Sequence, residues 1–168
     1  MIKGPKGTEV ILSILRNSEM FDVAIVRDRI VVKNVEMETI SSEAIVIDIN
    51  MFSVGVYEEF LQQLQEQELN SRKRVIIDLT NNPGGSLQEV MQFLDHFVPT
   101  GEVSMGIQQL NRSQDIVAEA VDPDLFLGNK EIVVLINKGS ASAAEIMAGV
   151  IQEYVPQSIL IGETTFGK

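Results

Sequence analysis

Short apolar runs alternate with helix-like segments from about residue 35 to the end of the chain. The runs are rich in Ile, Val and Leu, and they predict buried strands over residues 44–49, 74–79, 131–137 and 158–161. The segments between them predict helices over residues 56–69, 86–97 and 142–154. Because strands that alternate with helices favour βαβ crossovers, we expect an α/β fold with a mostly parallel sheet.

The beginning of the chain has a different pattern. Residues 8–16 and 21–27 alternate between apolar and polar positions, and residues 17–19 between them have turn character, so we expect a β-hairpin. Because an isolated hairpin is only marginally stable, it must pack on something else or be the remnant of a larger module. Residues 101–128 are polar and irregular, with one expected strand.

The composition then narrows the class of protein. The chain has 168 residues and a formal net charge of −11, which argues against surfaces for nucleic acid or anionic membranes, because both need Lys and Arg. It has no cysteine and a single histidine, so disulfides, thiolate catalysis and multi-histidine metal sites are excluded, and we expect no metal and no cofactor. No apolar run approaches the roughly 20 residues of a membrane span, and residues 1–7 lack the apolar stretch of a signal peptide.

Two turns between a strand and a helix could carry chemistry. In open α/β sheets, ligands gather at the carboxyl ends of the strands. The first turn, residues 81–85, reads NNPGG, and paired glycines can leave backbone N–H groups uncovered for an oxyanion or a carbonyl. The alternative is a plain tight turn before a helix. Ser86 and Glu89 form a capping-box pattern at the start of that helix.

The second turn, residues 138–142, reads KGSAS and contains two serines. A serine at a helix N-terminus lies where N–H groups and the helix dipole favour negative charge, as the oxyanion of acyl transfer requires. Lys168 follows the next strand and could accept the serine proton, which gives a Ser–Lys pair. The alternatives are that the serines only cap the helix and that Lys168 is a solvated charge. His96, late in the helix expected over 86–97, favours a helix-dipole role over a Ser–His pair.

Together these motifs resemble the C-terminal processing peptidases, also called tail-specific proteases, of serine peptidase family S41. The likeness covers nearly the whole chain. Residues 4–16, with Val26 and Arg27, are similar to the last third of the family's PDZ domain and its exit strand. Three further stretches follow the order of the family's N-P-G-G turn, nucleophile region and lysine region: residues 76–85, 134–146 and 162–168.

The resemblance implies a crotonase/ClpP-like ββα superhelix with a mostly parallel sheet, plus a partial PDZ-derived β-hairpin at the N-terminus. Residues 1–34 would be the PDZ remnant and exit strand, and residues 35–168 the peptidase core, truncated at its C-terminal end. The same resemblance implies roles for individual residues. Ser142 would be the nucleophile and Lys168 the general base. The oxyanion hole would consist of the backbone N–H groups of Gly84 or Gly85 and of Ala143.

The chain departs from the family pattern at several positions. Ala144 stands where the pattern has its last serine, so Ser140 and Ser142 are the two candidate nucleophiles. Thr80 stands where the family often has arginine, and the spacing from Ser142 to Lys168 is one residue longer than we expect. The glutamine that often follows the lysine and orients it is absent from the sequence.

The activity implied by the resemblance is that of a serine endopeptidase that works through an acyl-enzyme. Lys168 must be neutral to accept the serine proton, and we expect Phe166 and the strand over 158–161 to provide a dry niche that favours this state. The implied substrates are polypeptides with unstructured C-terminal tails, captured by the PDZ module through β-addition, outside the cytoplasm in the cell envelope or secreted. No nucleic acid is expected, and a homo-oligomer and an adaptor protein remain open as partners.

Two other classes of function stay open. A crotonase-type acyl-CoA enzyme would use a glycine-rich oxyanion hole on the same fold, and the serine and lysine motifs would then be accidental. A peptide-binding or scaffold module with an incomplete catalytic site is the other alternative. Reaction with a serine-directed probe, dependent on Ser142 and Lys168, separates an enzyme from a binding module.

Overall fold

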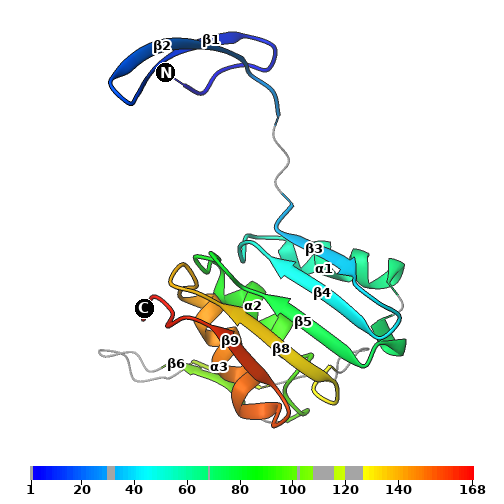
Figure 1. Ribbon diagram of the computed structural model, residues 1–168. Coiled ribbons are helices and arrows are strands. Elements are labelled where there is room, and N and C mark those ends of the chain that lie inside the picture. The colour runs from blue at the N-terminus through cyan, green and yellow to red at the C-terminus, as the bar shows by residue number, and fades with distance from the viewer. Residues whose placement is uncertain (1, 30–32, 68, 102, 108–115, 120–126) are drawn as a thin grey trace. The chain divides into compact units, whose positions relative to one another are not determined.

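A computed structural model describes residues 2–29, 33–67, 69–101, 103–107, 116–119 and 127–168. The chain divides into two compact units, Met1–Val32 and Lys33–Lys168, whose elements are drawn in Figure 1. The assignment of these parts to a PDZ remnant and a peptidase core stays a prediction.

The first unit is an antiparallel hairpin of β1 (Glu9–Arg16) and β2 (Glu19–Val26). Asn17 and Ser18 link the strands with φ values of 51° and 68°. Positive φ at both positions is what a two-residue turn between right-twisted strands requires, and Asn is among the residues that adopt it most readily. The hairpin expected from the alternating pattern is therefore present, and its origin in a PDZ domain stays a prediction.

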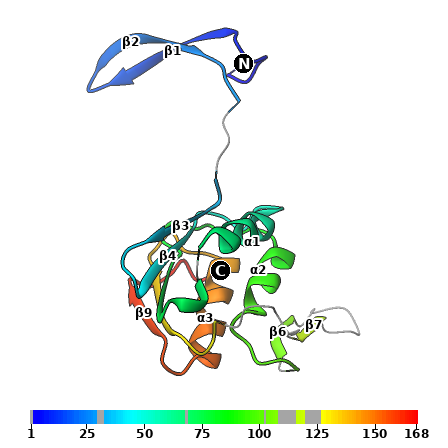
Figure 2. The same cartoon turned by 90° about the vertical axis from the view of Figure 1, so that its right-hand side faces the viewer.

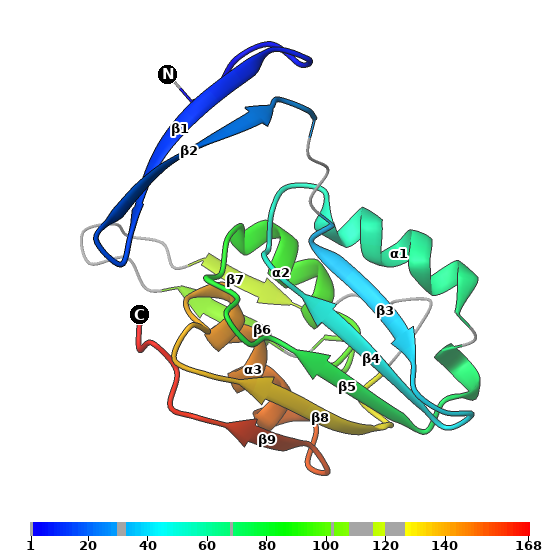
Figure 3. The ribbon, with the colours of Figure 1, turned by 45° about the horizontal axis from the view of Figure 1, so that its top comes forward.

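The second unit is built on a five-stranded sheet with the order β3-β4-β5-β8-β9, which can be followed across Figure 3. Strand β3 is antiparallel to β4, and the other neighbouring pairs are parallel. This confirms the mixed α/β fold with a mostly parallel sheet. The strands are β3 (Val35–Thr39), β4 (Ala44–Ile49), β5 (Arg74–Asp78), β8 (Glu131–Ile136) and β9 (Ile159–Gly162).

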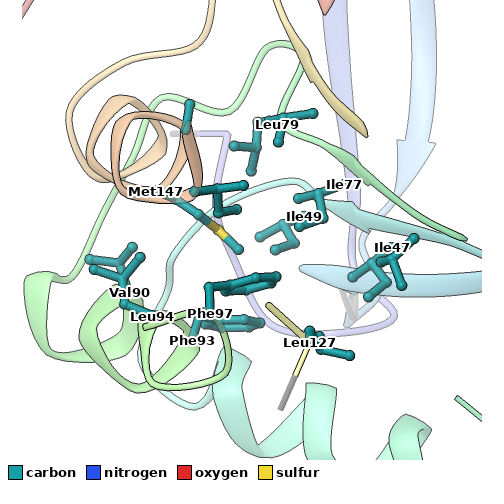
Figure 4. Close-up of a cluster of buried hydrophobic side chains, with 14 of the residues drawn as sticks. Ile47, Ile49, Ile77, Leu79, Val90, Phe93, Leu94, Phe97, Leu127 and Met147 are labelled. Atoms are coloured by element: carbon teal, nitrogen blue, oxygen red, sulfur yellow. The ribbon is translucent and has the colours of Figure 1, made fainter. Parts of the chain in front are cut away.

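The helices of the described chain cover one face of this sheet, as Figure 2 shows. Alternate residues of β4 and β5, such as Ile47 and Ile77, point toward the helices and are buried, and Phe93 from the helix Leu87–Leu94 belongs to the same core, drawn in Figure 4. Burying large apolar side chains between the two layers supplies most of the stabilisation of such a unit. The helices are α1 (Val56–Glu66), α2 (Leu87–Leu94) and α3 (Ala143–Tyr154), with a short 3-10 helix at Leu69–Ser71.

Several elements differ from the expectation. Strand β3 was not anticipated, because its sequence VEMET is mostly polar. Helix α1 ends at Glu66 and α2 at Leu94, three residues earlier than expected in each case. Residues 101–128 hold two strands, β6 (Val103–Ile107) and β7 (Ile116–Glu119), in place of the one expected; residues 108–115 and 120–126 lie outside the described residues.

His96 lies beyond the end of α2, so the expected position within the last helical turn is wrong. Its ring is 2% exposed, and its Nε2 is 2.9 Å from the hydroxyl oxygen of Tyr57. The Phe60 ring packs edge-on against it at 5.4 Å between centroids. His96 is thus a hydrogen-bonded core residue between α1 and α2, away from the expected site.

Candidate active site

The two candidate turns lie side by side because the strands before them are neighbours. Asp78 at the end of β5 is in register with Leu135 of β8, and the Leu79 N–H continues the ladder to the Leu135 carbonyl at 2.9 Å. The glycine loop (residues 82–85) and the serine turn (residues 139–142) therefore leave the same edge of the sheet. This is the carboxyl edge, where parallel α/β sheets bind their ligands.

Asn82 fixes the glycine loop from inside the protein. Its side chain is fully buried; its Nδ2 donates to the Ile49 carbonyl at 2.6 Å, and its Oδ1 accepts from the Gly84 N–H at 2.8 Å. The Asn82 carbonyl accepts from the Ala141 N–H at 2.9 Å. One buried amide thus joins the end of β4, the glycine loop and the serine turn.

Ser140 has a structural role within the serine turn. It is fully buried, and its Oγ donates to the Leu79 carbonyl at 2.7 Å and accepts from the Asn137 N–H at 2.9 Å. A hydroxyl whose proton and lone pair are both engaged inside the protein is poorly placed to attack a substrate. Of the two serines that the sequence left as candidates, the geometry favours Ser142.

Ser142 has an unusual backbone conformation. Its φ is 57° and its ψ is −116°, outside the regions that residues with a β-carbon normally occupy. It stands directly before α3, so a sharp strand-to-helix turn presents its side chain at the helix N-terminus. Strained backbone at such a turn is typical of sites where a nucleophilic serine must be displayed, and here the outlier itself motivates the hypothesis.

The predicted oxyanion donors have different environments. The Gly84 N–H is engaged by Asn82, whereas the N–H groups of Gly85 and Ala143 have no hydrogen-bond partner among the described residues. Gly84 packs directly on the serine turn: a β-carbon at Gly84 would lie 2.6 Å from the Ala141 carbonyl oxygen and 2.7 Å from the Ser142 Cβ. The glycine loop and the serine turn thus touch at a position where only glycine fits.

The lysine segment (residues 163–168) returns to the serine turn after β9. The Phe166 N–H donates to the Ser140 carbonyl at 3.0 Å, and Figures 1 and 3 both draw the C-terminal end beside the turn that follows β8. The structure therefore brings the backbone of Lys168 into the neighbourhood of Ser142. The side chain of Lys168 is exposed, and no hydrogen bond joins its Nζ to Ser142 Oγ in the described chain.

Glu145 connects the two segments. Its Oε2 accepts from the Ser142 N–H at 2.7 Å and from the Lys168 N–H at 3.1 Å. Its Oε1 accepts from the Thr165 hydroxyl at 2.8 Å and from the Gly167 N–H at 2.7 Å. The backbone nitrogens of Ser142 and Lys168 are therefore both in contact with a single carboxylate oxygen.

These contacts set the charge state of Glu145. Desolvation raises its pKa, but the hydrogen bonds from Thr165, Lys168, Gly167 and Ser142 together outweigh that effect and lower the pKa from 4.5 to about 2. The carboxylate is therefore ionised at neutral pH. It adds one negative charge beside the serine turn.

Phe166 does not provide the dry niche that the sequence suggested. Its ring is 70% exposed, and Ile159 and Ile161 of β9 are more than half exposed. Apolar side chains that face water cannot remove water from a neighbouring amine, so desolvation of Lys168 needs further atoms.

The described residues offer little for other chemistry. Among them, no group of three or more His, Cys, Asp or Glu side chains is placed to hold a metal ion. No helix in the described part of the chain is long and apolar enough to cross a membrane.

Two residues of the site were not identified from the sequence. Glu145 stands three positions after Ser142, the same spacing that marked Ser86 and Glu89 as a capping box, so the signal was present but unused. Asn82 lies inside the NPGG motif, and the motif alone does not indicate that its side chain is buried and bonded. The Glu89 side chain also differs from the expectation: Ser86 Oγ accepts from the Glu89 N–H, but the Glu89 carboxylate binds the N–H groups of Gly55 and Tyr57.

The sequence of the second unit matches a known family. The profile of Peptidase family S41 covers residues 44–168. The chain is also 33% identical to the "Probable CtpA-like serine protease" of Staphylococcus aureus strain COL; that match covers 99% of this chain and 33% of the relative. The chain thus spans about a third of the length of the curated relatives that it matches.

Solved structures show the same fold. The photosystem II D1 C-terminal processing protease superposes with a TM-score of 0.71 at 20% identity, over 98% of this chain and 46% of that protein. A lipoprotein from Streptococcus agalactiae superposes with a TM-score of 0.61 at 19% identity, over 78% of this chain and 49% of that protein. At these identities the likeness concerns the fold alone.

Proposed function

Because the chain belongs to serine peptidase family S41, we propose that it is the core of a C-terminal processing endopeptidase in which Ser142 is the nucleophile and Lys168 the general base. The observation that carries this proposal is the double attachment of Glu145, which ties the backbone of Lys168 to that of Ser142. The strained backbone of Ser142 supports the same assignment, as do the N–H groups of Gly85 and Ala143, which have no hydrogen-bond partner in the described part of the chain.

The reaction proceeds by acyl transfer. Neutral Lys168 takes the Ser142 hydroxyl proton while Oγ bonds to the carbonyl carbon of the scissile peptide. The tetrahedral intermediate then expels the amine, which receives the proton from the Lys168 ammonium, and the acyl-enzyme remains on Ser142. Water attacks this ester and gives a proton to Lys168; the second tetrahedral intermediate then expels Ser142 Oγ, which takes the proton back from the ammonium, and the carboxylic acid product leaves. A positioned base of this kind typically contributes about 10²–10⁴ in rate.

The intermediate's oxyanion is stabilised by the N–H groups of Gly85 and Ala143. Both lack a partner among the described residues, whereas the third predicted donor, the Gly84 N–H, already binds Asn82. The N-terminus of α3 adds its dipole at the same point. Loss of one such donor typically lowers the rate about 10²–10³-fold.

Lys168 must lose water before it acts as a base. Its side chain is exposed in this chain, and the neighbouring Phe166 does not cover it. Bound substrate, or a segment found in the threefold longer relatives, therefore has to cover the amine to favour its neutral form. Catalysis by the chain alone would then be slow and would depend on the substrate.

The wider expectations remain part of the proposal. The substrates would be polypeptides with unstructured C-terminal tails, and the hairpin β1–β2 would belong to a PDZ module that selects them. The second unit would have the crotonase/ClpP-like ββα superhelix. The kinship with CtpA-like proteases, together with the fold shared with a lipoprotein, supports a location outside the cytoplasm. A homo-oligomer and an adaptor protein are further proposed partners.

Cleavage of an unstructured polypeptide tests the proposal. Both Ser142→Ala and Lys168→Met should reduce cleavage by at least about 10²-fold while circular dichroism shows an unchanged fold. Lys73→Met is the matched control, because Lys73 is a 71% exposed lysine at the opposite end of β5 whose ion pair with Glu43 is on the surface. Cleavage that continues at the wild-type rate in Ser142→Ala would overturn the assignment.

The two alternative functions give other results in the same assays. A crotonase-type enzyme would bind a CoA thioester and leave the polypeptide intact. A peptide-binding module would bind the polypeptide equally well in the wild type and in Ser142→Ala, without cleavage in either.

A further inference from the structure

The hydrogen bonds of Glu145 point mainly away from its own helix. Glu145 occupies the third position of α3, where a carboxylate commonly accepts the N–H of the residue that caps the helix, here Ser142. That single bond would satisfy a capping role. The other three bonds go to Thr165, Gly167 and Lys168, which lie outside the helix and more than a complete strand later in the chain.

The lysine segment has few other attachments. Besides its bonds to Glu145, its hydrogen bonds to the rest of the described chain are Glu163 N–H to the Ile136 carbonyl at 3.2 Å and Phe166 N–H to the Ser140 carbonyl at 3.0 Å. No side chain of the described residues other than Glu145 accepts a hydrogen bond from Gly167 or Lys168. The Glu145 carboxylate, together with the bond of Phe166 to Ser140, therefore holds the last residues in place.

We propose that Glu145 is the positioning residue of the Ser–Lys pair: its carboxylate fastens the lysine segment to the serine turn and so determines where the Lys168 amine can reach. This inference rests on the proposed function, because positioning matters only if Lys168 is the base. Among the described residues, the Glu145 carboxylate bonds the backbone N–H groups of Ser142 and Lys168 and neither Ser142 Oγ nor Lys168 Nζ, so the carboxylate acts through the backbone of the pair.

Both carboxylate oxygens are required for this role. Each oxygen accepts two donors, so a glutamine at this position would direct its NH₂ group at one of the two pairs of donors. The Thr165 hydroxyl can turn to accept from that NH₂ group, but the Gly167 N–H cannot. Glu145→Gln therefore keeps the size of the side chain and loses part of the attachment.

Amide hydrogen exchange of the 168-residue chain tests the attachment without any need for activity. In Glu145→Gln, exchange at the Gly167 amide or at the Lys168 amide, whichever faces the new NH₂ group, should accelerate by about 10- to 100-fold, the effect of losing a hydrogen bond to a charged group. Glu89→Gln is the matched control. Glu89 is the third residue of α2, and its carboxylate likewise binds two backbone N–H groups of another segment, those of Gly55 and Tyr57. This variant should leave the exchange rates of the Gly167 and Lys168 amides unchanged.

The rate of reaction with a fluorophosphonate probe tests the positioning of the base. Glu145→Gln should lower the labelling rate of Ser142 about 10- to 100-fold. Thr165→Val removes one bond to Glu145 and leaves the cap of α3 intact, so it should lower the rate by a smaller factor of about 3–10. The double variant should label no more slowly than Glu145→Gln alone, because both substitutions remove the same attachment.

The outcomes separate this inference from the proposed function. Unchanged exchange at Gly167 and Lys168 in Glu145→Gln would overturn the attachment, whether or not the wild type is labelled. Faster exchange together with an unchanged labelling rate would overturn the positioning role while the Ser–Lys assignment stands. An unchanged labelling rate in Thr165→Val would overturn the part of the attachment that runs through the Thr165 hydroxyl. Absence of labelling in the wild type would contradict the proposed function. It would also overturn the positioning role of Glu145, which depends on that function.

Discussion

Gly84 lies so close to Ser142 that a β-carbon on Gly84 would approach the Ser142 Cβ to 2.7 Å. Gly84 also has a φ of 93°, which residues with a side chain rarely adopt. Gly84→Ala therefore combines backbone strain with a collision against the serine turn. We expect a loss of about 2–5 kcal/mol in the free energy of unfolding, measured by urea denaturation.

Gly101→Ala separates the two effects. Gly101 has a φ of 84°, but nothing lies within 4 Å of the position of its added β-carbon. This variant should lose only the backbone contribution, about 1–2 kcal/mol. Equal losses in the two variants would show that the contact between the glycine loop and the serine turn has no energetic weight.

Replacing Ser142 should reveal the strain at its backbone. With φ at 57° and ψ at −116°, a residue with a β-carbon is strained, whereas glycine is not. Ser142→Gly should therefore be more stable to unfolding than Ser142→Ala by about 1 kcal/mol, and neither variant should react with a serine probe. If Ser142→Ala and Ser142→Gly had the same free energy of unfolding, the strained turn would not be a property of the folded protein in solution.

Ser140→Ala should lower the free energy of unfolding and leave the reaction of Ser142 with a serine probe intact. Removing the hydroxyl takes the Ser140 acceptor from the Asn137 N–H and leaves the buried Leu79 carbonyl with only its bond from the Asn82 N–H, at a cost of about 1–3 kcal/mol measured by denaturation. Below its unfolding transition, the variant should still form a fluorophosphonate adduct. Loss of the adduct in a folded Ser140→Ala protein would indicate that Ser140, and not Ser142, is the nucleophile.

The lowered pKa of Glu145 should make the free energy of unfolding depend on pH. Its pKa is about 2 in the folded chain and near 4.5 when unfolded, so its contribution is complete above about pH 5. It is lost as the pH falls from about 4.5 toward 2, because the unfolded chain takes up the proton first. The difference in free energy of unfolding between the wild type and Glu145→Gln should shrink over this range.

The comparison with Glu145→Gln isolates this carboxylate from every other acid in the protein. Denaturation curves of both proteins at several pH values supply the measurement. A difference that stays constant from neutral pH to about pH 2 would contradict the four hydrogen bonds to Glu145.

Much of the fold can be predicted from the sequence because the central strands are covered on at least one face. Such strands read as near-continuous runs of Ile and Val, as in β4, β5 and β8, and alternation with helices then fixes their parallel direction. Strand β3 could not be predicted in this way. It lies at the sheet edge with one neighbour, so only Val35 of its five residues is buried and its sequence carries little apolar signal.

The site was only partly predictable for a different reason. The motifs indicate candidate residues for the chemistry, such as Ser142, but they do not show which backbone groups are already bonded. That Asn82 occupies the Gly84 N–H, and that Glu145 gathers Ser142 and Lys168, follow from contacts between distant segments. Likewise the sequence predicts only a helix-dipole role for His96 late in a helix, and the packing of α1 against α2 is needed to show its bond to Tyr57.

The most direct test of the Ser–Lys assignment is to map the covalent adduct of a fluorophosphonate by mass spectrometry after proteolysis. The wild-type chain should carry the adduct on Ser142, and the adduct should be lost in Ser142→Ala and strongly reduced in Lys168→Met. Lys73→Met should label as the wild type does. An adduct on another residue, or labelling of Ser142 that is indifferent to Lys168, would contradict the account.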